Sequence, residues 1–229
     1  MAKEQIGKAK VPKEYPPEEG CYLRGNDHSP VAVAVILKWR REETPKSIEE
    51  LVRVGLETGA ALSGTLQTEN VGLEKVICNI VANPNIRYLV VCGPETPGHH
   101  VGNAIKALYK NGIDKEKRII GTNAPAPFLF NIPQQSIQRF IEQTKFVDLV
   151  NEGSPGVIRD AVWSCYQEEP TRFKDYDLWD MGAYEVEPIC KPITWKITNP
   201  AYGPKDEKEK KALEKMQDLI RKLKERGKK

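Results

Sequence analysis

Several patterns that define common protein classes are missing from this sequence of 229 residues. No stretch approaches the roughly 18 apolar residues that a membrane helix requires, and the N-terminus has no apolar signal region. We therefore expect a soluble, cytoplasmic protein without a transmembrane segment. Five widely spaced cysteines form no CxxC pair, which favours reduced thiols over a disulfide framework. The net charge is only +3, with much of the positive excess at the two ends, so we expect no nucleic-acid-binding face.

Signatures of nucleophilic hydrolases and of dinucleotide-binding enzymes are missing as well. The sequence contains no GxSxG, and the stretch from Gly98 to Gly102 is GHHVG, which is not GxGxxG. Cys92 lies in an apolar segment and is expected in the core rather than at a reacting site. Histidine is scarce, with three in the whole chain. Two of them, His99 and His100, are adjacent. A functional interpretation starts from this pair.

The sequence does contain a repeated alternation of apolar runs and helical periodicity. Val31–Leu37 and Tyr88–Cys92 are continuous apolar runs, which are typical of strands buried on both faces. Ser47 followed by Glu50 has the outline of a capping box, which predicts the start of a helix. The alternation predicts a three-layer α/β fold with a mostly parallel sheet. Shorter strands are predicted at 20–25, 60–64 and 118–121, and further helices after a cap at Thr68 or Asn70 and at 101–110, 135–144 and 157–166.

The composition divides the chain into four parts. Residues 1–19, rich in lysine and proline, are expected to form a flexible basic arm. Residues 20–168 hold the α/β domain, and residues 169–204, rich in proline, tryptophan and tyrosine, are expected to form an irregular or hairpin extension. Residues 205–229 predict a charged amphipathic helix with a narrow apolar stripe. That helix is either a solvated surface helix or a contact for a partner or for an anionic membrane surface.

His99 and His100 lie where the strand at Tyr88–Cys92 ends and the next helix begins. In an open α/β sheet this point is at the carboxyl end of the strand, where ligands are bound. A histidine here can simply cap the helix or border a loop. It can also be a metal ligand, and because adjacent side chains diverge, a single imidazole would suit a metal already held by a tetrapyrrole or a corrin. The chain has no CxxCH motif for the attachment of haem.

Five glycines lie near the ends of the predicted strands. Their lack of a side chain would let a bulky, flat ligand approach the backbone, and the neighbouring helix N-termini could bind a phosphate. The alternative is that they are ordinary turn residues. The five are Gly64, Gly93, Gly98, Gly102 and Gly121.

Three segments, in order along the chain, resemble the cytoplasmic domain of the A subunit of tetrahydromethanopterin S-methyltransferase. They are LSGTLQTENVGLEKVICNIVANPNIRYLVVCG, GHHVGNAIKALYKNGI and IIGTNAPAPFLFNI, and the likeness covers roughly residues 20–165. The resemblance implies a Rossmann-like α/β fold that carries a cobamide, the cobalt corrinoid of the cobalamin class. A histidine in a Gly-His-x-x-Gly segment is the lower axial cobalt ligand in that family, which places this role on His99. The resemblance gives no role to His100.

The resemblance also implies a function in one-carbon metabolism related to methanogenesis. The chain would be a corrinoid carrier that accepts a methyl group from a methyl-tetrahydropterin on cobalt and passes it to a thiol acceptor. Both transfers would need partners, a methyltransferase for the methyl-tetrahydropterin and a second one for the thiol, so the chain would be a methyltransferase component that is inactive alone. A non-catalytic cobamide-binding module for storage, sensing or scaffolding is the alternative. Membrane-anchored family members end in a transmembrane helix, whereas this chain ends in a charged one, so sodium pumping is not expected.

The resemblance and the positions at strand ends together imply a set of cofactor contacts around His99. Several of them have a simpler explanation, since Thr68 and Glu69 can cap a helix and Thr122 to Pro127 can stiffen a loop. No residue is expected to be catalytic, because the cofactor supplies the nucleophile. The Asp-x-His-x-x-Gly motif of another cobalamin-binding fold is absent, since Pro97 stands two residues before His99. The implied contacts are Ser63, Gly64, Thr68, Glu69, Gly93, Gly98, Gly102, Gly121, Thr122, Ala124 and Pro125.

Overall fold

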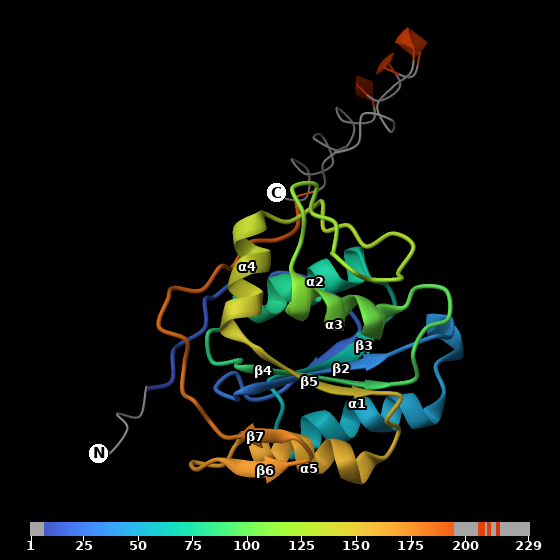
Figure 1. Cartoon of the computed structure of the whole chain (residues 1–229). Helices are drawn as coiled ribbons and strands as arrows, with labels where there is room; N and C mark the ends of the chain where they lie inside the picture. Colours follow the sequence, from blue (N-terminus) through green and yellow to red (C-terminus); the bar gives the residue numbers. More distant parts are fainter. Residues whose placement is uncertain (1–6, 195–205, 209, 212–213, 216–229) are drawn as a thin grey trace, which may run out of the picture. The chain divides into compact units, whose positions relative to one another are not determined.

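The computed structural model describes residues 7–194, 206–208, 210–211 and 214–215. The chain separates into two units, Met1–Thr194 and Trp195–Lys229. The first unit holds the fold and is shown in Figure 1. Of the charged helix expected at 205–229, the described residues from 207 onward are helical, and the remainder of that prediction lies outside the described residues.

A five-stranded sheet forms the middle layer of the first unit. The strand order is β1-β3-β2-β4-β5, in which β1 pairs antiparallel with β3 and the other four strands are parallel. The mostly parallel sheet is confirmed. The strand order reverses between β2 and β4, and ligands of doubly wound folds bind at the carboxyl ends beside such a reversal. The strands are β1 (Tyr22–Arg24), β2 (Val31–Ile36), β3 (Leu62–Leu66), β4 (Tyr88–Gly93) and β5 (Lys145–Val150).

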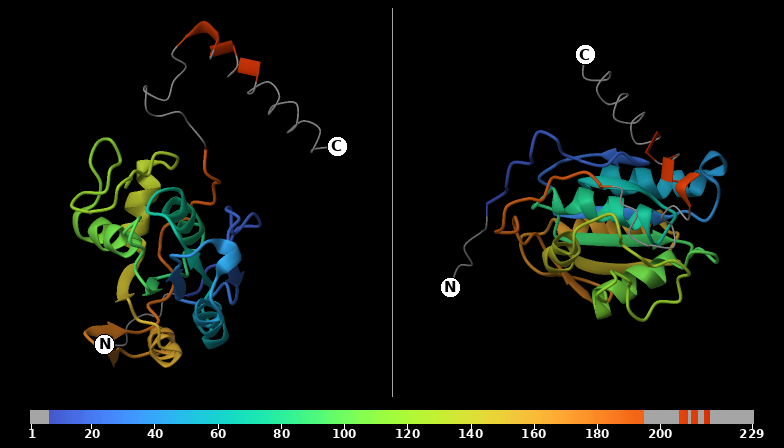
Figure 2. Two further views of the ribbon diagram at one scale, coloured as in Figure 1. Left: turned by 90° about the vertical axis from the view of Figure 1, so that its right-hand side faces the viewer. Right: turned by 90° about the horizontal axis from the view of Figure 1, so that it is seen from above.

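Helices cover both faces of the sheet, which confirms the three-layer α/β fold (Figures 1 and 2). One face carries α1 (Lys46–Thr58) and α5 (Pro155–Cys165), which pack together. The opposite face carries α2 (Val71–Val81), α3 (Val101–Asn111) and α4 (Gln134–Gln143). A short 3-10 helix, Arg41–Glu43, follows β2.

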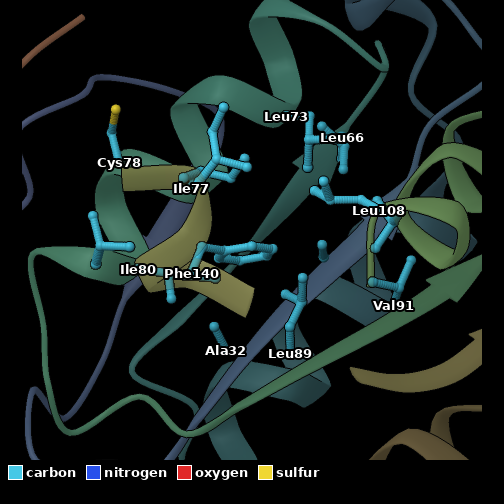
Figure 3. Packing of buried hydrophobic residues seen from close by; sticks show 14 of the residues in the cluster. Ala32, Leu66, Leu73, Ile77, Cys78, Ile80, Leu89, Val91, Leu108 and Phe140 are labelled. Carbon is cyan, nitrogen blue, oxygen red and sulfur yellow. The ribbon is translucent and has the colours of Figure 1, made fainter. Parts of the chain in front are cut away.

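Two apolar cores fill the spaces between these layers. Alternate residues of β2 point to opposite faces, so Ala32 and Ala34 join the core under α2, while Val33 and Val35 join the core over α1 and α5. Burial on both faces explains why this strand is a continuous apolar run. Figure 3 shows Phe140 of α4 pointing into the first of these cores.

Two local predictions are wrong. Pro45 is the N-cap of α1 and the helix begins at Lys46, so Ser47 lies inside the helix and forms no capping box. Residues 118–121 form no strand of the sheet. They contribute only isolated bridges, Ile113 to Ile119 and Arg118 to Phe128, within the long connection between α3 and α4.

The structure also contains strands that were not predicted. β5 has only Val147 and Leu149 fully buried, so its apolar content is too low to resemble the runs at β2 and β4. A small antiparallel hairpin joins β6 (Thr171–Phe173) to β7 (Tyr176–Leu178). It lies within the extension that was expected at 169–204 to be irregular or a hairpin.

Segments from the two ends of the first unit pack against the domain. The backbone of Ala9 makes two hydrogen bonds with the side chain of Asn85, and Tyr15 is buried. The amide of Ile193 donates to the carboxylate of Glu18. This part of the expected basic arm is therefore ordered against the domain, and the domain boundaries themselves stay a prediction.

Two expectations from composition are also addressed by the structure. All five cysteines are free, and burial raises the pKa of the Cys92 thiol to about 12, which agrees with a core residue. Within the described ranges, no helix combines the length and apolar character that crossing a bilayer requires.

Candidate functional site

A histidine and a buried glutamate meet at the carboxyl edge of the sheet. His99 lies in the turn between β4 and α3, and Glu69 lies in the loop between β3 and α2. The Nδ1 atom of His99 is 2.7 Å from Oε2 of Glu69. The Glu69 side chain is 0% exposed, whereas that of His99 is 47% exposed. One ring nitrogen is therefore held from below while the rest of the imidazole faces outward.

The hydrogen-bond chemistry of the pair defines which nitrogen is available. An ionised carboxylate only accepts hydrogen bonds, so Nδ1 of His99 carries the hydrogen and donates it to Glu69. The lone pair of a neutral imidazole then lies on Nε2. Nε2 forms no hydrogen bond with any other residue that the structure describes. This arrangement of carboxylate, imidazole and free Nε2 is the one that metal-ligating histidines adopt.

Glu69 is fixed on its other side by a second contact. Its Oε1 atom accepts a hydrogen bond from the backbone amide of Ala126, at 3.0 Å, in the long connection between α3 and α4. Each of its two oxygens thus has one partner, which satisfies a carboxylate that water does not reach. His99 and the segment around Ala126 are consequently tied to the same buried group.

The start of α2 is capped without help from Glu69. The side chain of Asn70 accepts from the amide of Val71, and the hydroxyl of Thr68 accepts from the amide of Gly72. The capping role predicted for Thr68 or Asn70 is confirmed. Because the two next amides of the helix bond to backbone carbonyls, no amide of this first turn is left for a bound phosphate.

The start of α3 is capped by a residue that the sequence did not single out. Oε1 of Glu95 accepts from the amide of Gly102 at 3.0 Å, and Oε2 accepts from the amide of Asn103 at 2.8 Å. The hydroxyl of Thr96 accepts from the amide of Val101. The expectation that these helix N-termini could bind a phosphate is therefore wrong, because protein groups already occupy their donors.

The connection between α3 and α4 folds back over the beginning of α3. Thr122 donates to Oδ1 of Asn103, and the amide of Asn123 donates to the same oxygen. The amide of Ala124 in turn donates to the hydroxyl of Thr122. Together with the bond from Ala126 to Glu69, these contacts place the 122–126 segment beside the His99 site. Pro125 and Ala126 are exposed there.

The glycines and Ser63 divide into those at the site and those that serve packing. Gly98 is exposed, and an added Cβ there would meet no atom within 4 Å. At Gly102 a Cβ would lie 2.7 Å from Val150, so this glycine is required by packing. Gly93, at the end of β4, and Gly121, in a turn, have positive φ angles that favour glycine. Ser63 donates to the Val52 carbonyl of α1, on the other face of the sheet, and Gly64 lies against Tyr22 of β1.

The groups that join the loops to one another were not identified from the sequence. These are Glu95, Asn103 and the amide of Ala126. An acidic residue shortly before a helix is a signal for an N-terminal cap, so Glu95 could have been found. The amide of Ala126 carries no side-chain signal.

The site presents a single imidazole rather than a set of protein ligands. The part of the chain that the structure describes contains no group of three or more His, Cys, Asp or Glu residues arranged to hold a metal ion. Next to His99, the exposed residues Pro97 and Gly98 carry no charge. The arrangement suits one axial bond to a metal whose other ligands are brought by a flat organic group.

Comparison with known proteins identifies the family. The family model for the A subunit of tetrahydromethanopterin S-methyltransferase matches residues 8–189. The A 2 subunit of this enzyme from Methanothermobacter marburgensis is 39% identical over 190 residues, 82% of this chain and 91% of the relative. The A 1 subunit from the same organism is 39% identical over 168 residues, 72% of this chain and 66% of the relative. The chain therefore belongs to the family of the A subunit of tetrahydromethanopterin S-methyltransferase.

Proposed function

We propose that this chain is the cobamide-carrying component of a methyl-transfer system, with His99 as the axial ligand of cobalt. The observation that carries the proposal is the bond between His99 and Glu69. It leaves Nε2 unpaired among the described residues, on a side chain that is 47% exposed, at the edge of the sheet where ligands of α/β folds bind.

The residues around His99 fit a flat corrinoid on three counts. The imidazole is exposed, its second nitrogen has a buried acceptor, and the residue before it, Gly98, offers no side chain that would obstruct a ring system. A metal-ligating histidine commonly donates its other N–H to a carboxylate in this manner. The absence of companion ligands among the described residues matches a cofactor that supplies the remaining ligands itself.

A bound cobamide would supply the nucleophilic metal that takes a methyl group from a methyl-tetrahydropterin and yields it to a thiol. The chain's own residues hold and tune the axial ligand. Glu69 fixes the tautomer and orientation of His99. Its negative charge makes the imidazole a stronger electron-pair donor to a metal. The amide of Ala126 holds Glu69 in place from the other side.

Partner proteins are part of the proposal. The matched relatives are named as subunits of tetrahydromethanopterin S-methyltransferase, so other chains act with them. We propose that separate methyltransferases, one for the pterin and one for the thiol, approach the exposed His99 side of this chain. The free thiols of the five cysteines are in keeping with work in the cytoplasm.

The first test is a spectroscopic titration of the full chain with hydroxocobalamin. We expect stoichiometric binding and a shift of the visible bands in the wild type and in His100→Ala, and loss of the shift in His99→Ala. His100 is the matched control, because it is the adjacent histidine and its side chain makes no capping bond.

Isotope labelling can identify the axial nitrogen directly. The measurement is electron paramagnetic resonance of the Co(II) form, obtained by reduction. An axial ¹⁴N splits each cobalt line into a triplet, and an axial ¹⁵N splits it into a doublet. Protein labelled with [¹⁵N]histidine should therefore give a doublet with His99 present and not in His99→Ala. A triplet in the labelled wild type would mean that no histidine binds the metal, and it would contradict the proposal.

A further inference from the structure

The connection between α3 and α4 is tied to the rest of the domain at two points near His99. Among the described residues, the hydrogen bonds that residues 121–126 make outside this connection go only to Asn103 and to Glu69. Asn103 lies in the first turn of α3, and Glu69 lies in the loop before α2. The segment therefore bridges the start of α3 and the carboxylate that orients His99.

The side-chain amide of Asn103 has one orientation that its partners allow. Its Oδ1 atom accepts from the amide of Asn123 at 2.9 Å and from the hydroxyl of Thr122 at 2.8 Å. A backbone N–H can only donate, so the oxygen of the Asn103 side chain, and not its nitrogen, has to face Asn123. Thr122 uses its hydroxyl in both directions, because it also accepts from the amide of Ala124 at 3.1 Å. One acceptor atom thus organises three successive residues.

These contacts close a ring around the site. From Asn103 the ring passes through the 122–126 segment to Ala126, whose amide donates to Oε1 of Glu69 at 3.0 Å. The other oxygen of Glu69 lies 2.7 Å from Nδ1 of His99, and His99 shortly precedes the helix that carries Asn103. Loss of the Asn103 acceptor would open the ring at the end that belongs to α3.

The position of the Ala126 amide has few other polar restraints. The residues next to Ala126 bond only within the connection, which fixes its shape but not its place relative to the domain. The next hydrogen-bonded tie to the domain is at Asn131, which binds Glu74. The buried side chain of Ala124 adds an apolar contact. Asn103 is therefore the polar tie that sets where the Ala126 amide meets its acceptor.

We propose that Asn103 is a positioning residue for His99 and acts through the 122–126 segment and Glu69. Its side chain makes no hydrogen bond with the imidazole, and it determines how firmly the carboxylate that holds Nδ1 is fixed. As a statement about a cobalt ligand the inference rests on the proposed function, whereas the restraint on the imidazole is a property of the chain by itself. The two parts can be measured separately.

Nuclear magnetic resonance of protein labelled with [¹⁵N]histidine tests the restraint without any cofactor. In a neutral imidazole, the ¹⁵N shifts distinguish the nitrogen that carries the hydrogen from the one that holds the lone pair, and the signals missing in His99→Ala assign His99. We expect one tautomer in the wild type, with the hydrogen on Nδ1. Asn103→Leu, which is close in volume and has no acceptor, should give a mixture of the two tautomers. Asn103→Asp keeps an acceptor oxygen and should restore the single tautomer.

Asn111→Leu is the matched control. Asn111 lies at the other end of α3, and its Nδ2 donates to the carbonyl of Ile120 in the same connection. The change removes a bond between the same helix and the same connection that does not lead to Glu69, so the single tautomer of His99 should remain. If Asn111→Leu mixed the tautomers as far as Asn103→Leu, the loss of any tie would suffice, and the specific role of Asn103 would be overturned.

Titration with hydroxocobalamin tests the consequence for the ligand. Asn103→Leu should weaken binding by about 5–10-fold, which corresponds to the loss of one or two hydrogen bonds. In the Glu69→Ala background the same change should cause no further loss, because Asn103 acts through Glu69. An equal loss in the two backgrounds would mean that Asn103 acts by another route, and it would overturn the inference.

The results separate the inference from the proposed function. A single tautomer and an unchanged hydroxocobalamin affinity in Asn103→Leu would overturn the inference and leave the proposed function standing. Mixed tautomers in Asn103→Leu, when even the wild type binds no corrinoid, would support the restraint and overturn the proposed function.

A second variant decides if Asn103→Leu fails to fold, as judged by circular dichroism. Thr122→Val removes one of the two donors to Asn103 and leaves the acceptor in place, so it should shift the His99 tautomers in the same direction. Thr122→Ser keeps the hydroxyl and should restore the single tautomer. An unchanged tautomer in folded Thr122→Val would then overturn the inference.

Discussion

The β3–α2 and β4–α3 loops each place a glutamate between the carboxyl end of a parallel strand and a helix, and they use it differently. Glu95 accepts from amides in the first turn of α3, so its charge stabilises a helix end. Glu69 makes no such bond to α2, and its oxygens bind His99 and the amide of Ala126. The two glutamates occupy equivalent positions in the fold. Only their contacts distinguish the one that caps a helix from the one that holds His99.

The capping residues of the two helices explain this difference. Asn70 and Thr68 satisfy the first amides of α2, so Glu69 is not needed there. The N-cap of α3 is His100, which has a left-handed backbone conformation and no side-chain capping bond. The carboxylate of Glu95 supplies the capping acceptors that the side chain of His100 does not. A helix that is capped by small polar residues thus releases a carboxylate for the site.

Replacement of Glu69 is expected to have the largest effect on the site. Glu69→Ala removes the acceptor of His99 Nδ1 and leaves the ring free to rotate, so we expect hydroxocobalamin affinity to fall by about 10–100-fold. Spectroscopic titration measures this loss. Glu69→Gln keeps one acceptor oxygen and should lose less. An unchanged affinity in Glu69→Ala would show that the carboxylate does not position the ligand.

Glu95→Ala is expected to affect stability instead of binding. The variant leaves the amides of Gly102 and Asn103 without their acceptor, and we expect the free energy of unfolding to fall by about 1 kcal/mol. Urea unfolding measures the change, and Glu49→Ala, in the exposed first turn of α1, is the matched control. A loss of hydroxocobalamin affinity as large as in Glu69→Ala, in folded protein, would remove the distinction between the two glutamates.

The sequence predicts the elements well where hydrophobic pattern and caps agree. The apolar runs of β2 and β4, and the cap at Asn70, are local signals, and the structure bears them out. Ser47 and Glu50 imitate a capping box, but Pro45 already sets the start of α1. Local pattern is therefore sufficient for most of the layers.

The pairing at the site depends on topology. Glu69 and His99 are 30 residues apart and follow β3 and β4, which are separated in the sheet by β2. The order of strands decides that these two loops meet, and periodicity carries no information on that order. Family resemblance pointed to His99 as a ligand, whereas the contact that orients it had to come from the structure.

A third glutamate, Glu74, is buried as Glu69 is, and its replacement offers the smallest effect and the sharpest contrast with Glu69. Both of its oxygens accept from Asn131, so it anchors the other end of the connection between α3 and α4, away from His99. Burial raises the pKa of Glu74 above its ordinary value of 4.5, and the bonds from Asn131 only partly oppose this. The folded protein therefore holds the proton on Glu74 to a higher pH than the unfolded chain does.

The sign of the resulting pH dependence follows from linkage. As pH rises past 4.5, the unfolded chain releases this proton first, so the contribution of Glu74 to stability is present below that value and is lost as pH rises through the raised pKa. Glu74→Gln removes the titration. We expect the free energy of unfolding of the wild type to fall relative to Glu74→Gln over this window, as urea unfolding at a series of pH values would show. Glu142→Gln, on the exposed side of α4, is the control and should show no such difference from the wild type. Hydroxocobalamin affinity should be the same in all three proteins, because Glu74, unlike Glu69, does not touch His99. A difference between wild type and Glu74→Gln that grows in the opposite direction would mean that Asn131 outweighs burial.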